Sequence, residues 1–198
     1  MSLPRVYPIV ESAAWIARLA PTGVRLVQLR IKERPAAEVR MEIRAARARC
    51  AAAAMQLIVN DHWEAALAEG CDFVHLGQGD LEGVDLTALR RAGVRLGIST
   101  HDEAELERAL AARPDYVALG PIYPTVLKIM PWQPQGLARL GEWKRRIGTL
   151  PLVAIGGLTL ERLPGVFAAG ADVAAVVTDI VRHADPEERA RAWLRAAA

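Results

Sequence analysis

Short apolar runs alternate with longer amphipathic stretches along the whole chain. The runs are rich in valine, isoleucine and leucine and almost continuously apolar, which is typical of parallel strands that are buried on both faces. This pattern predicts strands over residues 6–10, 24–30, 56–61, 73–77, 95–99, 116–120, 152–157 and 173–180.

The stretches between these runs have the periodicity of helices. Leu106, Ala109 and Leu110 follow the i, i+3, i+4 spacing of a helix face that packs on a core. Thr100 and Glu103 have the spacing of a capping box, so Thr100 is expected to open the helix that follows it. The pattern predicts helices over residues 36–53, 103–113, 136–147 and 186–197, among others.

The strand–helix unit repeats eight times without a second block of composition. This repetition predicts an α/β fold, a single (β/α)8 TIM barrel forming one domain over residues 1–198. The chain is compact for that fold, which typically takes about 250 residues. Residues 121–135 contain four prolines and cannot form a helix. An irregular loop of this length in a compact chain is usually functional.

Composition and charge narrow the class of protein. Lysine and arginine number 25 against 23 acidic residues, a net charge of +2, which disfavours nucleic-acid or membrane binding through bulk charge. No stretch approaches the roughly 20 apolar residues of a membrane span, and residues 1–11 lack a signal-peptide pattern. Cys50 and Cys71 have no metal-site spacing and are expected to be free thiols. The expected location is the cytoplasm.

Polar residues follow the predicted strands, at the end where a barrel of this type builds its active site. Alternation along the second strand puts Gln28, Arg30 and Lys32 on one face. Singly, such residues are also common as helix caps, turns or solvated charges, but every strand from the second to the eighth ends in one. The others are Asn60, Asp61, Asp80, Ser99, Thr125, Lys128, Gly156, Gly157, Val177 and Thr178.

These residue types suit phosphate and metal chemistry. Three cations at one rim would suit a diphosphate, and two carboxylates on adjacent strand ends would suit Mg²⁺. Backbone groups after the seventh and eighth strands often form a second phosphate site. Two phosphate sites and a metal predict a transferase that joins two phosphorylated small molecules. His75 is expected to be a packed or rim histidine rather than a ligand, and Trp132 could line the site.

Several motifs together resemble the thiamine-phosphate synthase family over nearly the whole chain. The third and sixth motifs below are the most specific of them. The motifs are Val27-Gln-Leu-Arg-Ile-Lys32, Val59-Asn-Asp61, His75-Leu-Gly-Gln-Gly-Asp80, Gly97-Ile-Ser99, Val153-Ala-Ile-Gly-Gly157, Asp115-Tyr-Val-Ala-Leu-Gly-Pro-Ile-Tyr-Pro-Thr125 and Ala175-Val-Val-Thr178.

The resemblance implies an activity and a role for each residue. Hydroxymethylpyrimidine diphosphate and a thiazole phosphate would combine to give thiamine phosphate and diphosphate, the diphosphate leaving first from a pyrimidine-methyl cation. Arg30, Lys32, Ser99 and Lys128 would be the catalytic residues, and Asp61 and Asp80 would bind Mg²⁺. The pyrimidine diphosphate would be held by Gln28, Arg30, Lys32, Asn60, Ser99 and Lys128, and the thiazole phosphate by Thr125, Gly157, Val177 and Thr178.

Two departures from the family pattern keep alternatives open. Leu127 stands where the family usually has a phosphate-binding threonine, and His62 stands where an arginine commonly follows the Asn-Asp pair. One alternative is a metal-free thiazole tautomerase, but such proteins lack the paired aspartates. Another is a non-catalytic protein that binds thiamine precursors. The sequence is compatible with a homo-oligomer without specifying one.

Overall fold

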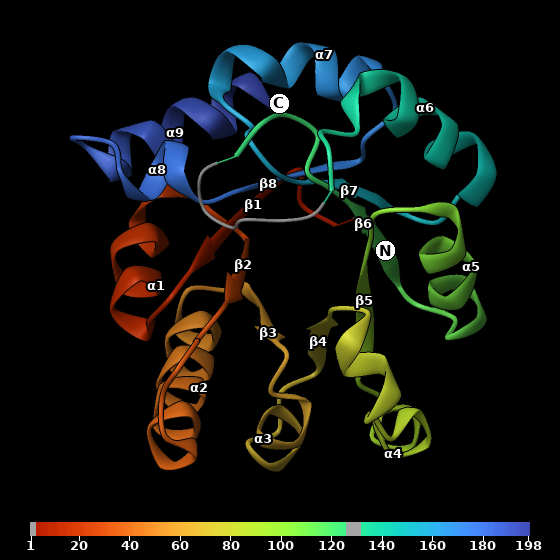
Figure 1. The fold of residues 1–198 in the computed structure, drawn as a ribbon. Helices are drawn as coiled ribbons and strands as arrows, with labels where there is room; N and C mark the ends of the chain where they lie inside the picture. The colour runs from red at the N-terminus through yellow and green to blue at the C-terminus, as the bar shows by residue number, and fades with distance from the viewer. Residues whose placement is uncertain (1–2, 126–131) are drawn as a thin grey trace.

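The computed structural model describes residues 3–125 and 132–198 and has the expected barrel architecture (Figure 1). Eight parallel strands pair in chain order, and the last pairs with the first to close the sheet. The (β/α)8 fold predicted from the sequence is therefore confirmed. The strands are β1 (Val6–Val10), β2 (Leu26–Leu29), β3 (Gln56–Asn60), β4 (Phe73–Leu76), β5 (Arg95–Thr100), β6 (Tyr116–Leu119), β7 (Leu152–Ala154) and β8 (Val173–Val176).

Helices surround this ring of strands (Figure 1). None of the helices in the described part of the chain is long and apolar enough to cross a membrane. The helices are α1 (Ala13–Leu19), α2 (Ala36–Ala52), α3 (Trp63–Ala68), α4 (Leu86–Arg91), α5 (Glu103–Ala111), α6 (Gly136–Ile147), α7 (Leu163–Ala168), α8 (Thr178–Val181) and α9 (Pro186–Ala196).

The core has two layers because successive side chains on a strand point to opposite faces. On β2, Val27 and Leu29 pack with helix residues such as Ile43 in the outer layer. Leu26 belongs to the inner layer, which fills the barrel. Gln28 shares that inward face, as the alternation predicted. The inner layer consists of Tyr7, Ile9, Leu26, Ile58, Phe73, Tyr116, Ala118, Val153, Val173 and Ala175.

The last two predicted strands are too long. Strand β7 ends at Ala154. Strand β8 ends at Val176, and helix α8 begins at Thr178 within the run predicted as a strand over residues 173–180. The glycines after β7 have φ of 95° and 64°, which no extended strand contains. For the eighth run, continuous apolarity does not separate a buried strand from a buried helical turn. Both strands therefore end sooner and place their polar residues in loops or at a helix start.

The expected cap of α5 is also wrong. Thr100 is the last residue of β5, and its hydroxyl donates to the carbonyl oxygen of Ala118 at 2.9 Å. The cap is Asp102, whose carboxylate accepts from the backbone N–H of Glu105 at 2.8 Å. The Glu105 carboxylate in turn accepts from the N–H of His101 at 2.7 Å, so the capping interactions lie two residues later than predicted.

Candidate active site

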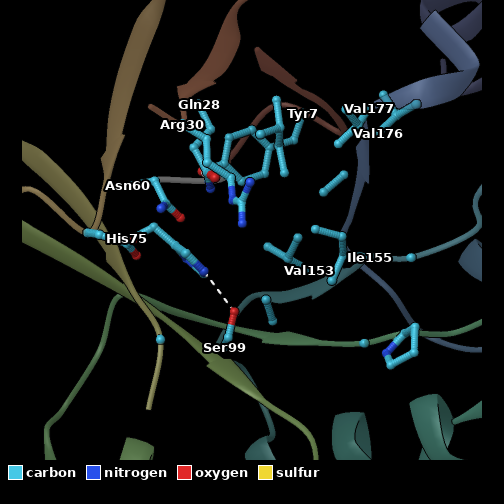
Figure 2. Close-up of a pocket in the computed structure, with 18 of the residues that line it drawn as sticks. Tyr7, Gln28, Arg30, Asn60, His75, Ser99, Val153, Ile155, Val176 and Val177 are labelled. Atoms are coloured by element: carbon cyan, nitrogen blue, oxygen red, sulfur yellow. Dashed lines mark hydrogen bonds between the residues drawn. The ribbon is translucent and has the colours of Figure 1, made fainter. Parts of the chain in front are cut away.

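One cavity of about 700 Å³ lies at the carboxyl ends of the strands, where the sequence placed the site. In Figure 2, polar side chains from β2 to β5 line one side of this cavity, and Val153, Ile155, Val176 and Val177 line the other. Lys128 and Leu127 lie outside the described residues. The predicted site residues that line the cavity are Gln28, Arg30, Lys32, Asn60, Asp61, Asp80, Ser99, Thr125, Gly157, Val177 and Thr178.

The cationic side of the cavity begins where β2 ends. The backbone N–H of Arg30 donates to the carbonyl oxygen of Val10 at 2.8 Å, which extends the β1–β2 pairing by one bond. Lys32 makes an ion pair with Asp61. Arg34 also lines the cavity and was missed, although it continues the alternation of Gln28, Arg30 and Lys32. Each of these arginines and lysines is solvent-exposed, so an anion in the cavity can reach them.

The two aspartates form a pair of carboxylates within hydrogen-bonding reach of each other. Asp61 follows β3 with a left-handed backbone, φ 61°, and its N–H donates to the carbonyl oxygen of His75 at 2.9 Å. Asp80 lies in the 3₁₀ turn Gly79–Glu82 that follows β4, and its Oδ2 accepts from the N–H of Gly77 at 2.9 Å. The left-handed backbone of Asp61 is a conformation that is costly for a residue other than glycine and is common at functional sites.

The two carboxylates of this pair repel each other when both are ionised. Burial raises the pKa of Asp80 above its ordinary value, and the charge of Asp61 acts in the same direction. Burial also acts to raise the pKa of Asp61, but Lys32 outweighs it and holds that pKa below the ordinary value. The charge of Asp61 thus disfavours ionisation of Asp80, and a cation placed between the two carboxylates would relieve that repulsion.

This donor set fits Mg²⁺. Magnesium usually takes one or two protein carboxylates and completes its octahedron with water and phosphate oxygens. Among residues 3–125 and 132–198, no group of three or more histidine, cysteine, aspartate or glutamate side chains forms a larger metal cluster. The paired aspartates beside an anion-binding rim are therefore suited to a metal that is shared with a phosphorylated ligand.

The opposite side of the cavity is built from backbone. The N–H of Tyr123 donates to the carbonyl oxygen of Gly156 at 3.1 Å, so the segment after β6 lies against the turn after β7. A Cβ on Gly157 would come within 2.5 Å of the carbonyl oxygen of Pro124. Thr125 and Thr178 line the cavity beside this turn. Only glycine permits so close an approach of the two loops, and their main chains border the apolar side of the cavity.

A buried hydrogen-bond network, which the sequence did not suggest, crosses the floor of the cavity. Gln28 Nε2 donates to Tyr7 Oη at 2.8 Å, and the hydroxyls of Tyr7 and Tyr116 are 3.1 Å apart. His75 contacts the hydroxyl of Tyr116 through Nδ1 at 2.7 Å and Ser99 Oγ through Nε2 at 2.8 Å (Figure 2). The network thus begins and ends at two of the predicted site residues.

The protonation of this network is set by burial. Burial lowers the pKa of His75 to about 4, so the ring is neutral near pH 7. Burial raises the pKa of both Tyr7 and Tyr116, so both hydroxyls keep their protons. The prediction that His75 is packed is right as to its burial, but both ring nitrogens are engaged. The inward positions of the tyrosines on β1 and β6 were the available signal.

Trp132 does not line this cavity. Its ring stacks on His101, with ring centroids 5.4 Å apart and an interplanar angle of 8°. His101 lines the cavity, and its Nδ1 contacts Glu105 Oε2 at 2.7 Å. Trp132 therefore adjoins the site through His101 rather than directly.

The comparisons with known proteins agree with this architecture. A thiamine-phosphate synthase of Rhizobium etli is 64% identical over 198 residues, all of this chain and 97% of the relative. One of Klebsiella pneumoniae is 50% identical over 180 residues, 91% of this chain and 85% of the relative. The solved structure of a thiamine phosphate pyrophosphorylase from Pyrococcus furiosus shares the fold, with a TM-score of 0.86, 23% identity, and coverage of 98% and 95%.

The family model described as thiamine monophosphate synthase matches residues 6–180. That span includes all eight strands and every residue predicted for the site. The chain therefore belongs to the thiamine monophosphate synthase family and is a transferase of thiamine biosynthesis.

Proposed function

We propose that the chain condenses hydroxymethylpyrimidine diphosphate with a thiazole phosphate, giving thiamine phosphate and releasing diphosphate. One observation carries this proposal: a single cavity has a cationic, carboxylate-bearing side and a separate side built from glycine-rich backbone. Two phosphorylated substrates need two separate phosphate-binding surfaces, and the two sides of this cavity are suited to that role. The reaction is performed by one domain that spans residues 1–198.

The pyrimidine diphosphate lies across the polar side. Arg30 and Lys32 hold its phosphates, since both are exposed to the cavity. Gln28 and Asn60 are almost fully buried at 2% and 6% exposure, so they are fixed in place to orient the pyrimidine ring. Lys128 is proposed as a third cation on the diphosphate from its sequence position alone.

Asp61 and Asp80 would hold Mg²⁺ at the diphosphate. When bound, the metal neutralises the negative charge that builds on the leaving diphosphate. Lys32, which pairs with Asp61 in this structure, would then turn to the phosphate oxygens. These residues act by charge and position, and none of them has to form a covalent bond with the substrate.

The bond changes follow from this placement. The bond between the pyrimidine methylene carbon and the diphosphate oxygen breaks, and both electrons leave with the diphosphate. Arg30 and Lys32 stabilise this charge, and Ser99 holds the ring from the floor of the cavity. The thiazole nitrogen then donates its lone pair to the methylene cation and forms the new carbon–nitrogen bond. No proton is transferred in this step, so no general base is required.

The thiazole phosphate lies on the backbone side. The main chain of Gly157 and Val177, with the hydroxyls of Thr125 and Thr178, is available to bind its phosphate. Val153, Ile155 and the neighbouring valines offer an apolar wall for the thiazole ring (Figure 2). This wall excludes water from the methylene cation, which water would otherwise capture to give the pyrimidine alcohol.

The test is to measure thiamine phosphate and diphosphate with both substrates and Mg²⁺, omitting each in turn. Both products should appear in equal amounts only in the complete mixture. Binding of the pyrimidine diphosphate without any product would instead support the non-catalytic alternative. A cytoplasmic location and a homo-oligomeric state stay predictions.

A further inference from the structure

The glycine turn after β7 has two carbonyl oxygens that are held by protein donors. The carbonyl oxygen of Gly156 accepts from the N–H of Tyr123 at 3.1 Å. The carbonyl oxygen of Gly157 accepts from Nη1 of Arg162, which lies in the 3₁₀ turn Leu160–Arg162 before α7. The glycines line the cavity, but Tyr123 and Arg162 are not part of its lining. Both carbonyls are therefore bound on the side of the turn that faces away from the cavity.

The geometry of the peptide bond then decides where the N–H groups of the turn point. In a trans peptide unit the C=O and the N–H point in opposite directions. The carbonyl of Gly157 is directed to Arg162, so the N–H of Leu158 is directed the other way. Leu158 lines the cavity, although it is only 4% exposed. In the part of the chain that the structure describes, the N–H groups of Gly157 and Leu158 have no protein acceptor.

This turn is the part of the rim where a peptide unit can rotate at the lowest cost. Gly156 and Gly157 have φ of 95° and 64°, and glycine adopts positive φ about as readily as negative φ. Rotation of the unit between Gly157 and Leu158 would turn a carbonyl oxygen towards the cavity, where it would repel a phosphate. The bond from Arg162 therefore stabilises the orientation that can bind an anion over one that cannot.

A second contact holds the guanidinium of Arg162 in place. Its Cζ lies 4.3 Å from the centroid of the Tyr123 ring, within the range of a cation–π contact. Arg162 is exposed, so stacking on this ring limits the positions that its long side chain can take. Tyr123 belongs to the segment after β6, and a Cβ on Gly157 would come within 2.9 Å of the Tyr123 Cβ. One guanidinium thus joins the loops that follow β6 and β7.

We propose that Arg162 is a positioning residue for the second substrate: by holding the Gly157 carbonyl, it directs the N–H of Leu158 at a phosphate monoester. The inference rests on the proposed function in naming thiazole phosphate as the bound molecule. It adds to the backbone side of the cavity a further donor, Leu158, and a residue outside the cavity that orients this donor. Arg162 itself does not touch the substrate.

Arg162→Met tests this role, because methionine can still cover the Tyr123 ring but has neither the donor nor the charge. KM for thiazole phosphate should rise about fivefold, since the peptide unit then spends only part of its time in the orientation that binds. KM for the pyrimidine diphosphate should not change. In calorimetry the thiazole alcohol, which lacks the phosphate, should have the same Kd in wild type and variant. Equal weakening of the alcohol and the phosphate, or an unchanged KM, would overturn the inference.

Matched variants separate positioning from charge. Arg162→Lys keeps the charge and an N–H donor and should recover part of the affinity for thiazole phosphate. Arg182 is likewise exposed and directly follows α8, so Arg182→Met removes a positive charge without touching Gly157 and should behave as wild type. An equal rise in KM in Arg182→Met and Arg162→Met would mean that charge alone acts, and would overturn the inference. Tyr123→Leu should raise KM by a smaller factor, and adding it to Arg162→Met should raise KM no further.

Amide NMR keeps the inference testable if the variants do not fold. In wild type labelled with ¹⁵N-leucine, the Leu158 amide signal should shift during a titration with inorganic phosphate. An unmoved Leu158 signal at saturation with thiazole phosphate would overturn the inference. If phosphate moves this signal in wild type and not in Arg162→Met, but no thiamine phosphate forms, the proposed function fails and the positioning role stands. If product forms and Arg162→Met changes neither KM nor the signal, the reverse holds.

Discussion

Replacement of Asp80 by asparagine tests the metal pair most directly. The amide oxygen of asparagine can still accept from the N–H of Gly77, which Asp80 Oδ2 accepts at 2.9 Å. The side chain keeps its size and loses its charge. We therefore expect the variant to fold, to lose most of its Mg²⁺ affinity and to lose most of its turnover.

The sign of the stability change without metal follows from the pKa of Asp80. Burial and the charge of Asp61 raise this pKa, so the folded chain binds the proton more tightly than the unfolded chain does. The stability contributed by Asp80 is full below its ordinary pKa and is lost as pH rises through the raised value. Above the raised pKa the wild type has lost it, so at such pH metal-free Asp80→Asn should be at least as stable as wild type.

Added Mg²⁺ reverses that order. A ligand at a hundred times its Kd stabilises the folded state by about 2.7 kcal/mol. For a chain of 198 residues, in which about 1 kcal/mol shifts Tm by about 2–4 °C, the wild type should gain about 5–10 °C. If the variant binds a hundredfold more weakly, the same Mg²⁺ concentration gives about 0.4 kcal/mol, or about 1 °C.

Thermal unfolding with and without Mg²⁺ measures both effects in one experiment. Asp72→Asn is a matched control, because Asp72 precedes β4 at the opposite end of the barrel and pairs there with Arg95. The control should show the full Mg²⁺-induced rise in Tm. An equal rise in Asp80→Asn, or a metal-free Tm well below that of wild type, would refute the assignment of this carboxylate to the metal.

Three other predictions concern the floor and the two sides of the cavity. Gly97→Ala should destabilise the fold by about 1–3 kcal/mol in chemical denaturation and reduce activity, because its Cβ would lie 2.0 Å from the Tyr116 ring; Gly83→Ala, with open space around it, should do neither. Gly157→Ala should raise KM for the thiazole phosphate with little effect on KM for the pyrimidine diphosphate, and the opposite pattern in steady-state kinetics would contradict the backbone phosphate side. Lys32→Ala should move the acid limb of the kcat/KM profile to higher pH, since Lys32 holds the pKa of Asp61 down, and an unmoved limb would mean that Asp61 need not be ionised.

The barrel and most of the rim could be predicted because each follows from a local rule. Buried parallel strands are continuously apolar, and their repetition with helices leaves few topologies. The carboxyl ends of the strands face the same way, so polar residues at those ends meet whatever the loops do. For this reason residues as distant as Gln28 and Thr178 could be assigned to one cavity from the sequence.

The helix cap of α5 could not be predicted in the same way, because it depends on which partner a side chain binds in the folded structure. Threonine is a common cap residue, and Thr100 has the right spacing for one. However, its hydroxyl accepts from the indole N–H of Trp143 at 3.0 Å, and Thr100 is the last residue of β5 instead. That partner lies 43 residues away in the sequence. Local spacing does not contain such a contact, so Asp102 replaced Thr100 as the cap.

To predict the buried hydrogen-bond network, one would have to know which inward-facing residues lie in the same layer of the barrel. Tyr7 and Tyr116 are separated by 109 residues, and their hydroxyls meet only because β1 and β6 point side chains into the same barrel. His75 connects this network to the metal pair, because its ring contacts Tyr116 and Ser99 while its carbonyl oxygen accepts from the N–H of Asp61. A single residue of β4 thus contacts both the floor of the cavity and the turn that carries Asp61. In the proposed reaction the same strand would therefore hold the ring of one substrate in register with the charge of its leaving group, which dissociative chemistry needs because no covalent contact to the protein guides the reacting carbon.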